Sequence, residues 1–428
     1  MTTSNKTSIG RRSMLKLTLG SGAAALLATN PVFAQDTTLK MASYGGQDLI
    51  NRIGKALELF VAKHPGVKTE FESAPFADFF DRLAVQYSGG GAPDMHRHSM
   101  TYLYDYQKRG LLADLSGYLG KTIDTSELYP GVVEIGTQKG AIQAIGNNQI
   151  ALALFYDVEK FKSAGLEDRL ATMGWDDFRE IASKVGKAGG EKHYGTNDAG
   201  GFLAFFEQFL YQKGITMFPA EGGIGFTEDD CAEWFEFWAA MRADQGAPPA
   251  EVSAEAVGMQ NSPLVKGIGA MNSGWCQQLV FFQDLTQREL NVTRTPVPKE
   301  GGNGHFIRAL DFWVIPEQSK HKDLAAELIN FFLNDPEAIA TLGISLGGPP
   351  SAKATRILSE TATPTGQKVM DYLVKLREGA NKEIPIWVSG WAEFEGAIKR
   401  TNDSVGFGKL SPKDAGEQLF DEADRIFG

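Results

Sequence analysis

Three consecutive residues with side-chain amides, Asn147, Asn148 and Gln149, follow Gly146 in the sequence. Each amide is both a hydrogen-bond donor and an acceptor, so the run suits neighbouring hydroxyl groups on a solute. The alternative is a plain turn, because a Gly-Asn pair is a common turn signal by itself. The run therefore predicts either contact with a polyhydroxylated solute or a turn.

Polar side chains also follow the first expected strand, over residues 39–43. Ser43, Tyr44 and Gln47 lie at its end, before a helical pattern begins. Loops at strand ends are where ligand-binding groups gather in open α/β sheets. We expect these three residues to contact a ligand, with an ordinary loop as the alternative.

Trp275 follows Ser273-Gly274, where a buried strand is expected to open into a loop. A flat aromatic side chain there can remove the apolar face of a ring-shaped solute from water. Packing in the core is the alternative. We expect the Trp275 ring to stack on a ligand.

Charged and ligating residues are fewer. Arg308, Asp311 and Arg356 are candidate charged contacts, and an arginine suits a carboxylate, sulfonate or phosphate on the ligand. A solvated surface role is the favoured interpretation for each. His96 and His98 form a His-x-His pair, but a metal site usually requires more partners, so we expect no metal. His98 remains a candidate polar ligand contact.

The sequence does not favour catalysis. A hydrolase would need paired acids, or a nucleophile beside a base, and no Gly-x-Ser-x-Gly pattern is present. There is also no cysteine cluster, haem motif or dinucleotide fingerprint. We expect a non-enzymatic protein without a cofactor.

Strand and helix patterns alternate along the first part of the chain. A strand over 39–43, a helix around residues 53–61 and a strand over 67–73 are followed by another helix and the strand that begins at 92–95. This order implies a parallel sheet with helical crossovers. The pattern changes near residues 142–149, and strands near 150–156, 267–272 and 309–315 follow among aromatic-rich helices.

Residues 1–34 read as an export signal. Arg11 and Arg12 precede a short apolar and small-residue stretch that ends in Val32-Phe33-Ala34, and the segment carries no acidic residue. The paired arginines resemble a twin-arginine signal, and a Sec signal remains open. We expect the mature protein in the periplasm.

Removing four of the 42 basic residues with that signal leaves 38 basic against 53 acidic residues. A chain this acidic should not bind nucleic acid or anionic lipid by charge. The two cysteines, Cys231 and Cys276, allow one disulfide but do not require it.

Several short motifs occur in a fixed order along the mature chain. Together the motifs span roughly 300 residues, and each motif alone is a weak signal of a family. They lie at 56–60 and 64–67, 89–94, 110–115, 154–157 and 161–166, 174–178, 269–275, 296–299, and 325–332 and 335–338. In this order the chain resembles the extracellular solute-binding proteins of ABC importers, in particular the carbohydrate-binding group that includes maltose-binding protein.

The resemblance implies an α/β, two-lobed periplasmic-binding-protein fold with crossing hinge strands and an interlobe ligand cleft. It implies lobe 1 from 36–146 plus 305–345 and lobe 2 from 147–304 plus 346–428. Many members carry a Pro-Tyr pair where this chain has residues 146–149. This difference from the family affects the expected identity of the ligand more than the expected fold.

The resemblance also implies further cleft residues. They are His98, Phe202, Trp275, Gly348, Pro349 and Trp391, with Trp387 competing for the role of Trp391. Phe202 belongs to a Phe-rich run, so a core position is its alternative. The position of Gly348 and Pro349, where the chain returns between lobes, would bring their backbone near a ligand.

The function that the resemblance implies is a monomeric periplasmic receptor. It would bind a mono- or oligosaccharide, or a sugar derivative, and deliver it to the transmembrane subunits of an ABC permease. A receptor for a polyamine or a metal ion on the same fold is the alternative, and a periplasmic hydrolase is a weaker one.

Overall fold

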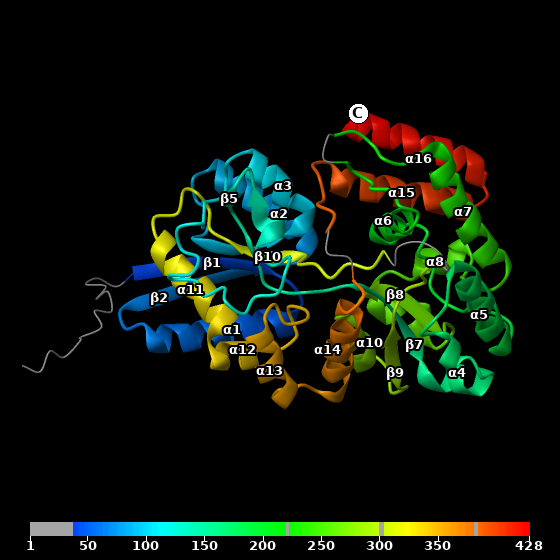
Figure 1. Cartoon of the computed structure of the whole chain (residues 1–428), viewed down its shortest axis with the longest axis horizontal. Coiled ribbons are helices and arrows are strands. Elements are labelled where there is room, and N and C mark those ends of the chain that lie inside the picture. The colour runs from blue at the N-terminus through cyan, green and yellow to red at the C-terminus, as the bar shows by residue number, and fades with distance from the viewer. Residues whose placement is uncertain (1–36, 220–221, 299–303, 381–383) are drawn as a thin grey trace, which may run out of the picture.

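The computed structural model describes residues 37–219, 222–298, 304–380 and 384–428. The predicted export signal over 1–34 lies outside the described residues. Two lobes lie side by side, each with a β-sheet flanked by helices (Figure 1). Within the described ranges, no helix is long and apolar enough to cross a membrane.

Lobe 1 is built on a five-stranded sheet with strand order β2-β1-β3-β10-β6. Strands β1 and β2 are parallel, as are β1 and β3, whereas β10 runs antiparallel to both β3 and β6. The strands are β1 (Thr37–Tyr44), β2 (Val67–Ala74), β3 (Met95–Ser99), β10 (Asp311–Val314) and β6 (Ile145–Gly146). The parallel β-α-β order predicted for residues 39–95 is therefore present.

Strand β1 shows how lobe 1 is packed. Leu39 and Met41 join one hydrophobic cluster, and Ala42 and Tyr44 join another, because alternate residues of a strand point to opposite faces. The helices of this lobe are α1 (Gln47–Lys63), α2 (Phe76–Ser88), α3 (Met100–Lys108), α11 (Lys322–Asn334) and α12 (Pro336–Leu342). The first cluster is covered by α1 and α11, and the second by α2 and α3.

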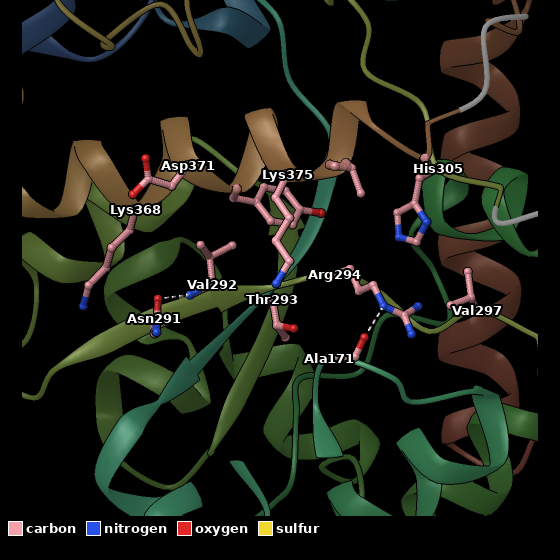
Figure 2. A pocket seen from close by; sticks show the side chains of 13 residues that line it. Ala171, Asn291, Val292, Thr293, Arg294, Val297, His305, Lys368, Asp371 and Lys375 are labelled. Atoms are coloured by element: carbon pink, nitrogen blue, oxygen red, sulfur yellow. Dashed lines mark hydrogen bonds between the residues drawn. The ribbon is translucent and has the colours of Figure 1, made fainter. Parts of the chain in front are cut away.

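Lobe 2 is built on a three-stranded sheet with order β8-β7-β9, in which both outer strands run antiparallel to β7. The strands are β7 (Leu152–Asp157), β8 (Met271–Trp275) and β9 (Leu290–Thr293). Helix α14 (Pro364–Arg377) lies across β9 (Figure 2). The other helices are α4 (Val158–Ala164), α5 (Trp175–Ala188), α6 (Leu203–Gln212), α7 (Glu228–Ala243), α8 (Ala250–Glu255), α9 (Pro263–Lys266), α10 (Gln278–Asp284), α15 (Trp391–Gly406) and α16 (Pro412–Phe427).

Short elements complete the chain. They are α13 (Ala352–Thr361), the 3-10 turns η1 (Glu134–Gly136), η2 (Glu167–Arg169) and η3 (Met259–Asn261), and the hairpin of β4 (Thr137–Gln138) and β5 (Ala141–Ile142). Helix α13 contacts α11 and α12 of lobe 1, whereas α14 contacts β9 and α10 of lobe 2. The predicted lobe boundaries stay a proposal, and this packing favours a change of lobe between α13 and α14.

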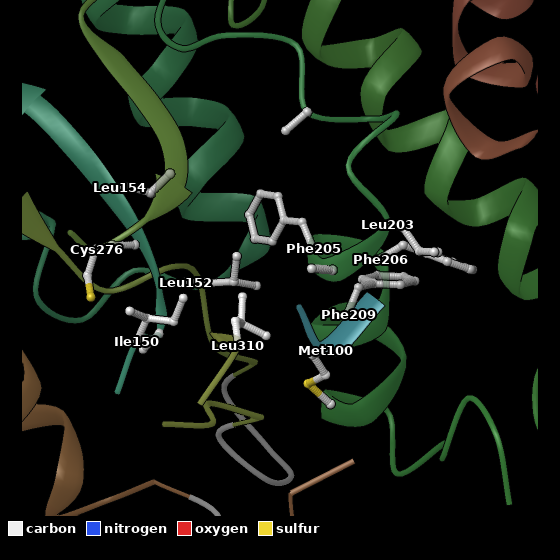
Figure 3. Packing of buried hydrophobic residues seen from close by; sticks show 14 of the residues in the cluster. Met100, Ile150, Leu152, Leu154, Leu203, Phe205, Phe206, Phe209, Cys276 and Leu310 are labelled. Carbon is white, nitrogen blue, oxygen red and sulfur yellow. The ribbon is translucent and has the colours of Figure 1, made fainter. Parts of the chain in front are cut away.

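The hydrophobic core continues from one lobe to the other. Met100 and Leu310 lie beside Ile150, Leu152 and the phenylalanines of α6 (Figure 3). The aromatic run of α6 is largely core, because Phe205, Phe206 and Phe209 are buried. Burying these rings together ties the two lobes into one cluster.

Residues 147–151 and 305–310 run between the lobes, and residues 346–350 pair beside them; we call these three segments the crossing region. Gln149 pairs with Gly348, and Ile150 pairs with Arg308, in antiparallel bridges. A Cβ at Gly348 would lie 2.2 Å from the Leu373 side chain and 2.5 Å from the Gln149 carbonyl oxygen. The close approach of the segments therefore requires glycine at that position.

Cys231 and Cys276 are both buried and free, so they do not form the disulfide that the sequence left open. Burial raises the pKa of both thiols, that of Cys276 to about 12. A thiol with so high a pKa stays protonated and unreactive at neutral pH.

Candidate functional site

Aromatic side chains gather where the strands of lobe 1 end. Tyr44 closes β1, and its ring centroid lies 5.1 Å from that of Phe76, the first residue of α2. The ring centroid of Phe80, on the same helix, lies 4.2 Å from that of Tyr102 on α3. Phe76 is 44 % exposed although it packs in this cluster. The carboxyl ends of the parallel strands thus present an aromatic wall.

Helix α15 of lobe 2 faces this wall. Ser389, just before α15, donates a hydrogen bond to Asp105 of α3. Burial raises the pKa of Tyr102, and the carboxylate of Glu395 on α15 raises it further. In Figure 1, α15 and α6 face α2 and α3 on one side of the crossing region, and α14 lies on the other side.

A groove of about 430 Å³ lies in lobe 2; we call it the lobe-2 groove. Trp275 is the last residue of β8 and pairs with Leu152, at the end of β7 where the chain arrives from lobe 1. The Trp275 ring is partly exposed, with Phe202 edge-on at 5.8 Å. The polar and charged groups of the groove include Asn197, Asp198, Asn272, Ser273, Gln278, Lys399, Asn402 and Asp403.

Side-chain hydrogen bonds fix the floor of the lobe-2 groove. Asn197 Oδ1 accepts from the backbone N–H of Ser273 at 2.7 Å and from its hydroxyl at 3.0 Å. Gln278 Oε1 accepts from the backbone N–H of Trp275 at 2.9 Å. A Cβ at Gly274 would lie 2.3 Å from that same oxygen, so the glycine lets Gln278 approach. The loop that presents the Trp275 ring is held rigidly.

The groove adjoins the face between the lobes. Glu395 and Lys399 are four residues apart on α15 and so lie on one face of the helix. Lys399 lines the groove, and the Glu395 carboxylate raises the pKa of Tyr102 in lobe 1. One face of α15 thus runs from the groove toward the aromatic wall.

The residues predicted after β1 have partners inside lobe 1. The Ser43 hydroxyl is buried and donates to the Tyr44 carbonyl at 3.2 Å. The Tyr44 hydroxyl donates to Asp311, which also accepts from Arg97 at 2.8 Å. Gln47 is exposed and donates to Asn51 at 2.8 Å. These contacts build the lobe, and their role in ligand binding stays a prediction.

Two of the three predicted amides hold the crossing region together. Asn148 donates to Asp311 at 2.9 Å and to the Leu346 carbonyl at 2.8 Å. Gln149 donates to the Pro130 carbonyl at 2.8 Å and accepts from Arg377 at 2.8 Å. Their hydrogen-bonding groups are consumed by the protein, so a ligand would have to compete for them.

The Asn147 side chain differs, because both of its polar atoms are buried and have no partner among the described residues. It lines a cavity of only about 30 Å³ that Gly348 and Pro349 also line. The structure brings these three predicted residues together, apart from the Trp275 groove. A cavity of this size suits one water or one small ligand group.

Arg308 is buried and ion-paired. Its guanidinium contacts the Glu207 carboxylate at 2.9 Å, and both side chains are at most 3 % exposed. The favoured surface role for Arg308 is therefore wrong, because burial of the charge is offset by this pair. Burial raises the pKa of Glu207, and Arg308 opposes the rise. Arg356 is the exposed partner of Glu127.

Trp387 and Trp391 form one unit. Their rings stack in parallel with centroids 4.0 Å apart. Trp387 donates its indole N–H to Glu207 at 3.2 Å, whereas the buried Trp391 N–H has no partner within the described part of the chain. The two predicted tryptophans are thus neighbours, and neither is an isolated surface ring.

His96 and His98 lie side by side in β3, with ring centroids 5.2 Å apart. Burial lowers the pKa of both, that of His96 to about 4. His96 contacts the Tyr87 hydroxyl at 2.9 Å, whereas neither ring nitrogen of His98 has a hydrogen bond of normal geometry to a described residue. In the described ranges, no three His, Cys, Asp or Glu side chains are grouped as a metal site would need.

Sequence reasoning missed several residues of these walls. Asn197, Gln278 and Lys399 line the groove. Phe76 belongs to the aromatic wall of lobe 1, and Glu395 of α15 lies near Tyr102 of that wall. Gln278 could have been found, because it lies three residues after Trp275 at the start of a helix. The others come from distant segments, and no local pattern connects them.

Residues 46–339 match the family described as bacterial extracellular solute-binding protein. The chain belongs to this family. The solute-binding protein is 24 % identical over 383 residues to the arabinooligosaccharide-binding protein of Bacillus subtilis, covering 84 % of this chain and 85 % of that protein. It is 23 % identical over 326 residues to a putative binding protein of Brucella abortus, covering 74 % and 76 %.

Solved structures share the fold. A periplasmic oligogalacturonide binding protein from Yersinia enterocolitica, in complex with saturated digalacturonic acid, matches with a TM-score of 0.80 at 21 % identity, covering 91 % of this chain and 98 % of that one. A substrate-binding protein from Listeria monocytogenes, in complex with cycloalternan, matches with a TM-score of 0.79 at 19 % identity. The match covers 91 % of this chain and 99 % of that one. The solute-binding protein therefore has the two-lobed fold that its sequence predicts.

Proposed function

We propose that this solute-binding protein is a monomeric periplasmic receptor that binds a sugar or sugar derivative and delivers it to an ABC permease. The observation that carries the proposal is the lobe-2 groove, in which the partly exposed Trp275 ring lies among fixed amides and hydroxyls. The protein would bind its ligand without changing a covalent bond.

The groove has the two properties that binding a sugar in water requires. Trp275 and Phe202 can cover an apolar ring face. Asn197, Asn272 and Gln278 offer polar groups that can replace water at hydroxyls, and each unmet hydroxyl would cost about 1–3 kcal/mol. The volume of about 430 Å³ is within the usual range for small-molecule sites, roughly 300–1,000 Å³.

The similar proteins support the same ligand class. The Bacillus subtilis relative is named for arabinooligosaccharides, and the Yersinia and Listeria structures hold digalacturonic acid and cycloalternan. Ligand that touches both the groove and the aromatic wall of lobe 1 would stabilise the closed arrangement, because only that arrangement makes both sets of contacts.

The ligand need not be an anion. Arg308 is neutralised by Glu207, and the exposed Arg356 by Glu127. A polyamine is the second candidate, because burial raises the pKa of the Glu395 and Asp403 carboxylates near the groove. A cationic ligand would relieve that cost of burial.

A thermal-shift screen of the mature chain tests the proposal. Neutral oligosaccharides, sugar acids, polyols, polyamines and divalent metal salts are the arms, since any ligand of the folded state raises the melting temperature by mass action. We expect a saccharide to give the largest shift. A shift with polyamines or metals alone would contradict the sugar-receptor proposal.

A further inference from the structure

A second pocket, of about 500 Å³, lies between β9 and α14; we call it the β9–α14 pocket. It shares no lining residue with the lobe-2 groove, and β9 and β8 are the opposite outer strands of the lobe-2 sheet. The pocket is therefore a separate feature from the Trp275 groove.

The cationic residues of this pocket exceed its anionic ones. Arg294, Lys368 and Lys375 line it together with one carboxylate, that of Asp371. Lys368 is paired with Glu289 at 3.0 Å outside the pocket lining. Asp371 accepts a hydrogen bond from Gln367 at 2.7 Å. The neutral Gln367 amide does not cancel the charge of Asp371. With Lys368 paired, Arg294, Lys375 and Asp371 therefore leave the lining with one net positive charge.

Arg294 is held half-buried by uncharged groups. Its Nε donates to the Ala171 carbonyl at 2.6 Å, and its Nη1 lies 3.5 Å from the Thr295 carbonyl. Burial lowers the pKa of this guanidinium, and no carboxylate of the described chain pairs with it. Holding a partly desolvated cation without a counter-charge costs free energy unless an anion joins it.

Lys375 approaches Arg294 from the opposite wall. Its side chain descends from α14, and its amino group points into the pocket toward Thr293, whereas the Arg294 guanidinium lies on the side of Ala171 and Val297 (Figure 2). It makes no ion pair with any residue that the structure describes. Both cations line one pocket, and an anion that binds between them would be attracted by both.

Part of the remaining wall is apolar. Val292, Val297, Tyr372 and Leu376 supply it, and the Tyr372 ring is fixed because its hydroxyl donates to the Leu152 carbonyl at 2.5 Å. We propose that the β9–α14 pocket is a second ligand site, which binds a small organic carboxylate with an apolar body. The carboxylate lies between Arg294 and Lys375, since a guanidinium matches the geometry of a carboxylate, and the apolar body contacts Val292 and Leu376.

Calorimetric titration of the mature chain with phenylacetate tests this site, with 2-phenylethanol as the neutral probe of similar shape. We expect phenylacetate to bind and 2-phenylethanol not to bind. Lys375→Gln and Arg294→Gln should each weaken phenylacetate binding about tenfold, as loss of a charge-assisted hydrogen bond does. Lys375 is exposed, so its replacement should leave folding intact even if that of Arg294 does not.

Two further variants separate this site from the sugar site. Trp275→Ala should leave phenylacetate affinity unchanged, and Lys409→Gln, a surface lysine elsewhere, serves as the charge-matched control. The site is refuted if phenylacetate does not bind, if 2-phenylethanol binds equally well, or if Lys375→Gln and Lys409→Gln have the same effect. Failure of the sugar screen would not bear on this result, because the two sites share no residue.

Discussion

The crossing region and the lobe-2 groove both contain the polar and aromatic residue types that bind solutes, but the two regions use them differently. In the crossing region Asn148, Gln149 and Arg308 each have protein partners, and little capacity is left for a ligand. In the groove Trp275 remains partly exposed, and the hydrogen bonds of Gln278 fix the backbone beside it. Polar groups thus pair with one another in the crossing region, and they line an open groove in lobe 2.

The largest effect is expected in the crossing region. Glu207→Leu should lower the free energy of unfolding by about 3–5 kcal/mol, because it leaves the Arg308 charge buried without a partner. Urea denaturation measures the loss. The double variant Glu207→Leu/Arg308→Met removes both charges and should recover most of the stability. A loss below about 1 kcal/mol in the single variant would show that the pair is not buried as described.

In the groove the expected effect is on affinity. Trp275→Ala should weaken binding of the saccharide found in the screen by about 1–3 kcal/mol, because the stacking ring is lost. The control is Phe407→Ala, which removes an aromatic ring that is 45 % exposed outside the groove lining. Calorimetry measures the saccharide affinity of both variants. Equal affinities would show that Trp275 is not part of the binding site.

Acidification should destabilise lobe 1 through its buried histidines. Burial holds the pKa of His96 at about 4, so between pH 6.5 and 4 the unfolded chain binds a proton that the folded chain does not. The free energy of unfolding should fall with decreasing pH in this window, by about 1.4 kcal/mol per pH unit for each such histidine.

His98→Met sharpens that measurement. The His98 ring nitrogens have no normal hydrogen bond to a described residue, so the variant loses little bonding while removing one titrating group. We expect a shallower slope of unfolding free energy against pH for the variant. The same slope in both proteins would mean that His98 does not titrate with unfolding.

The smallest effect is expected at Arg356. Its ion pair with Glu127 is exposed, because the Arg356 side chain is 64 % exposed and that of Glu127 39 %. Exposed ion pairs contribute about 0–1 kcal/mol to stability. Arg356→Ala should change neither stability beyond that amount nor saccharide affinity. A clear loss of affinity would instead revive a charged contact at this residue.

Local patterns in the sequence predicted much of the fold. The spacing of Ile53, Ala56, Leu57 and Phe60 marks α1 because these residues share one buried face. The strand predicted at 267–272 is wrong in position, since β8 occupies Met271–Trp275. Gly267 ends α9, and Gly269 forms only an isolated parallel bridge with Tyr194. Apolar character alone cannot locate the start of a strand in such a segment.

The site was less predictable. Trp275 could be singled out because a glycine and a strand end mark its position. Arg308 could not be assigned, because its partner Glu207 lies 101 residues away and nothing local indicates burial. The groove residues Asn197 and Lys399 meet Trp275 only through the tertiary fold, so no spacing in the sequence reveals them.

Closure of the lobes on a ligand is tested most directly by the distance between the lobes with and without ligand. Spin labels at Lys108→Cys on α3 and Arg400→Cys on α15 report it by double electron–electron resonance, because the native Cys231 and Cys276 are fully buried. We expect a single short distance at saturating saccharide and a longer, broader distribution without it. Identical distributions in the two states would contradict binding by closure of the lobes.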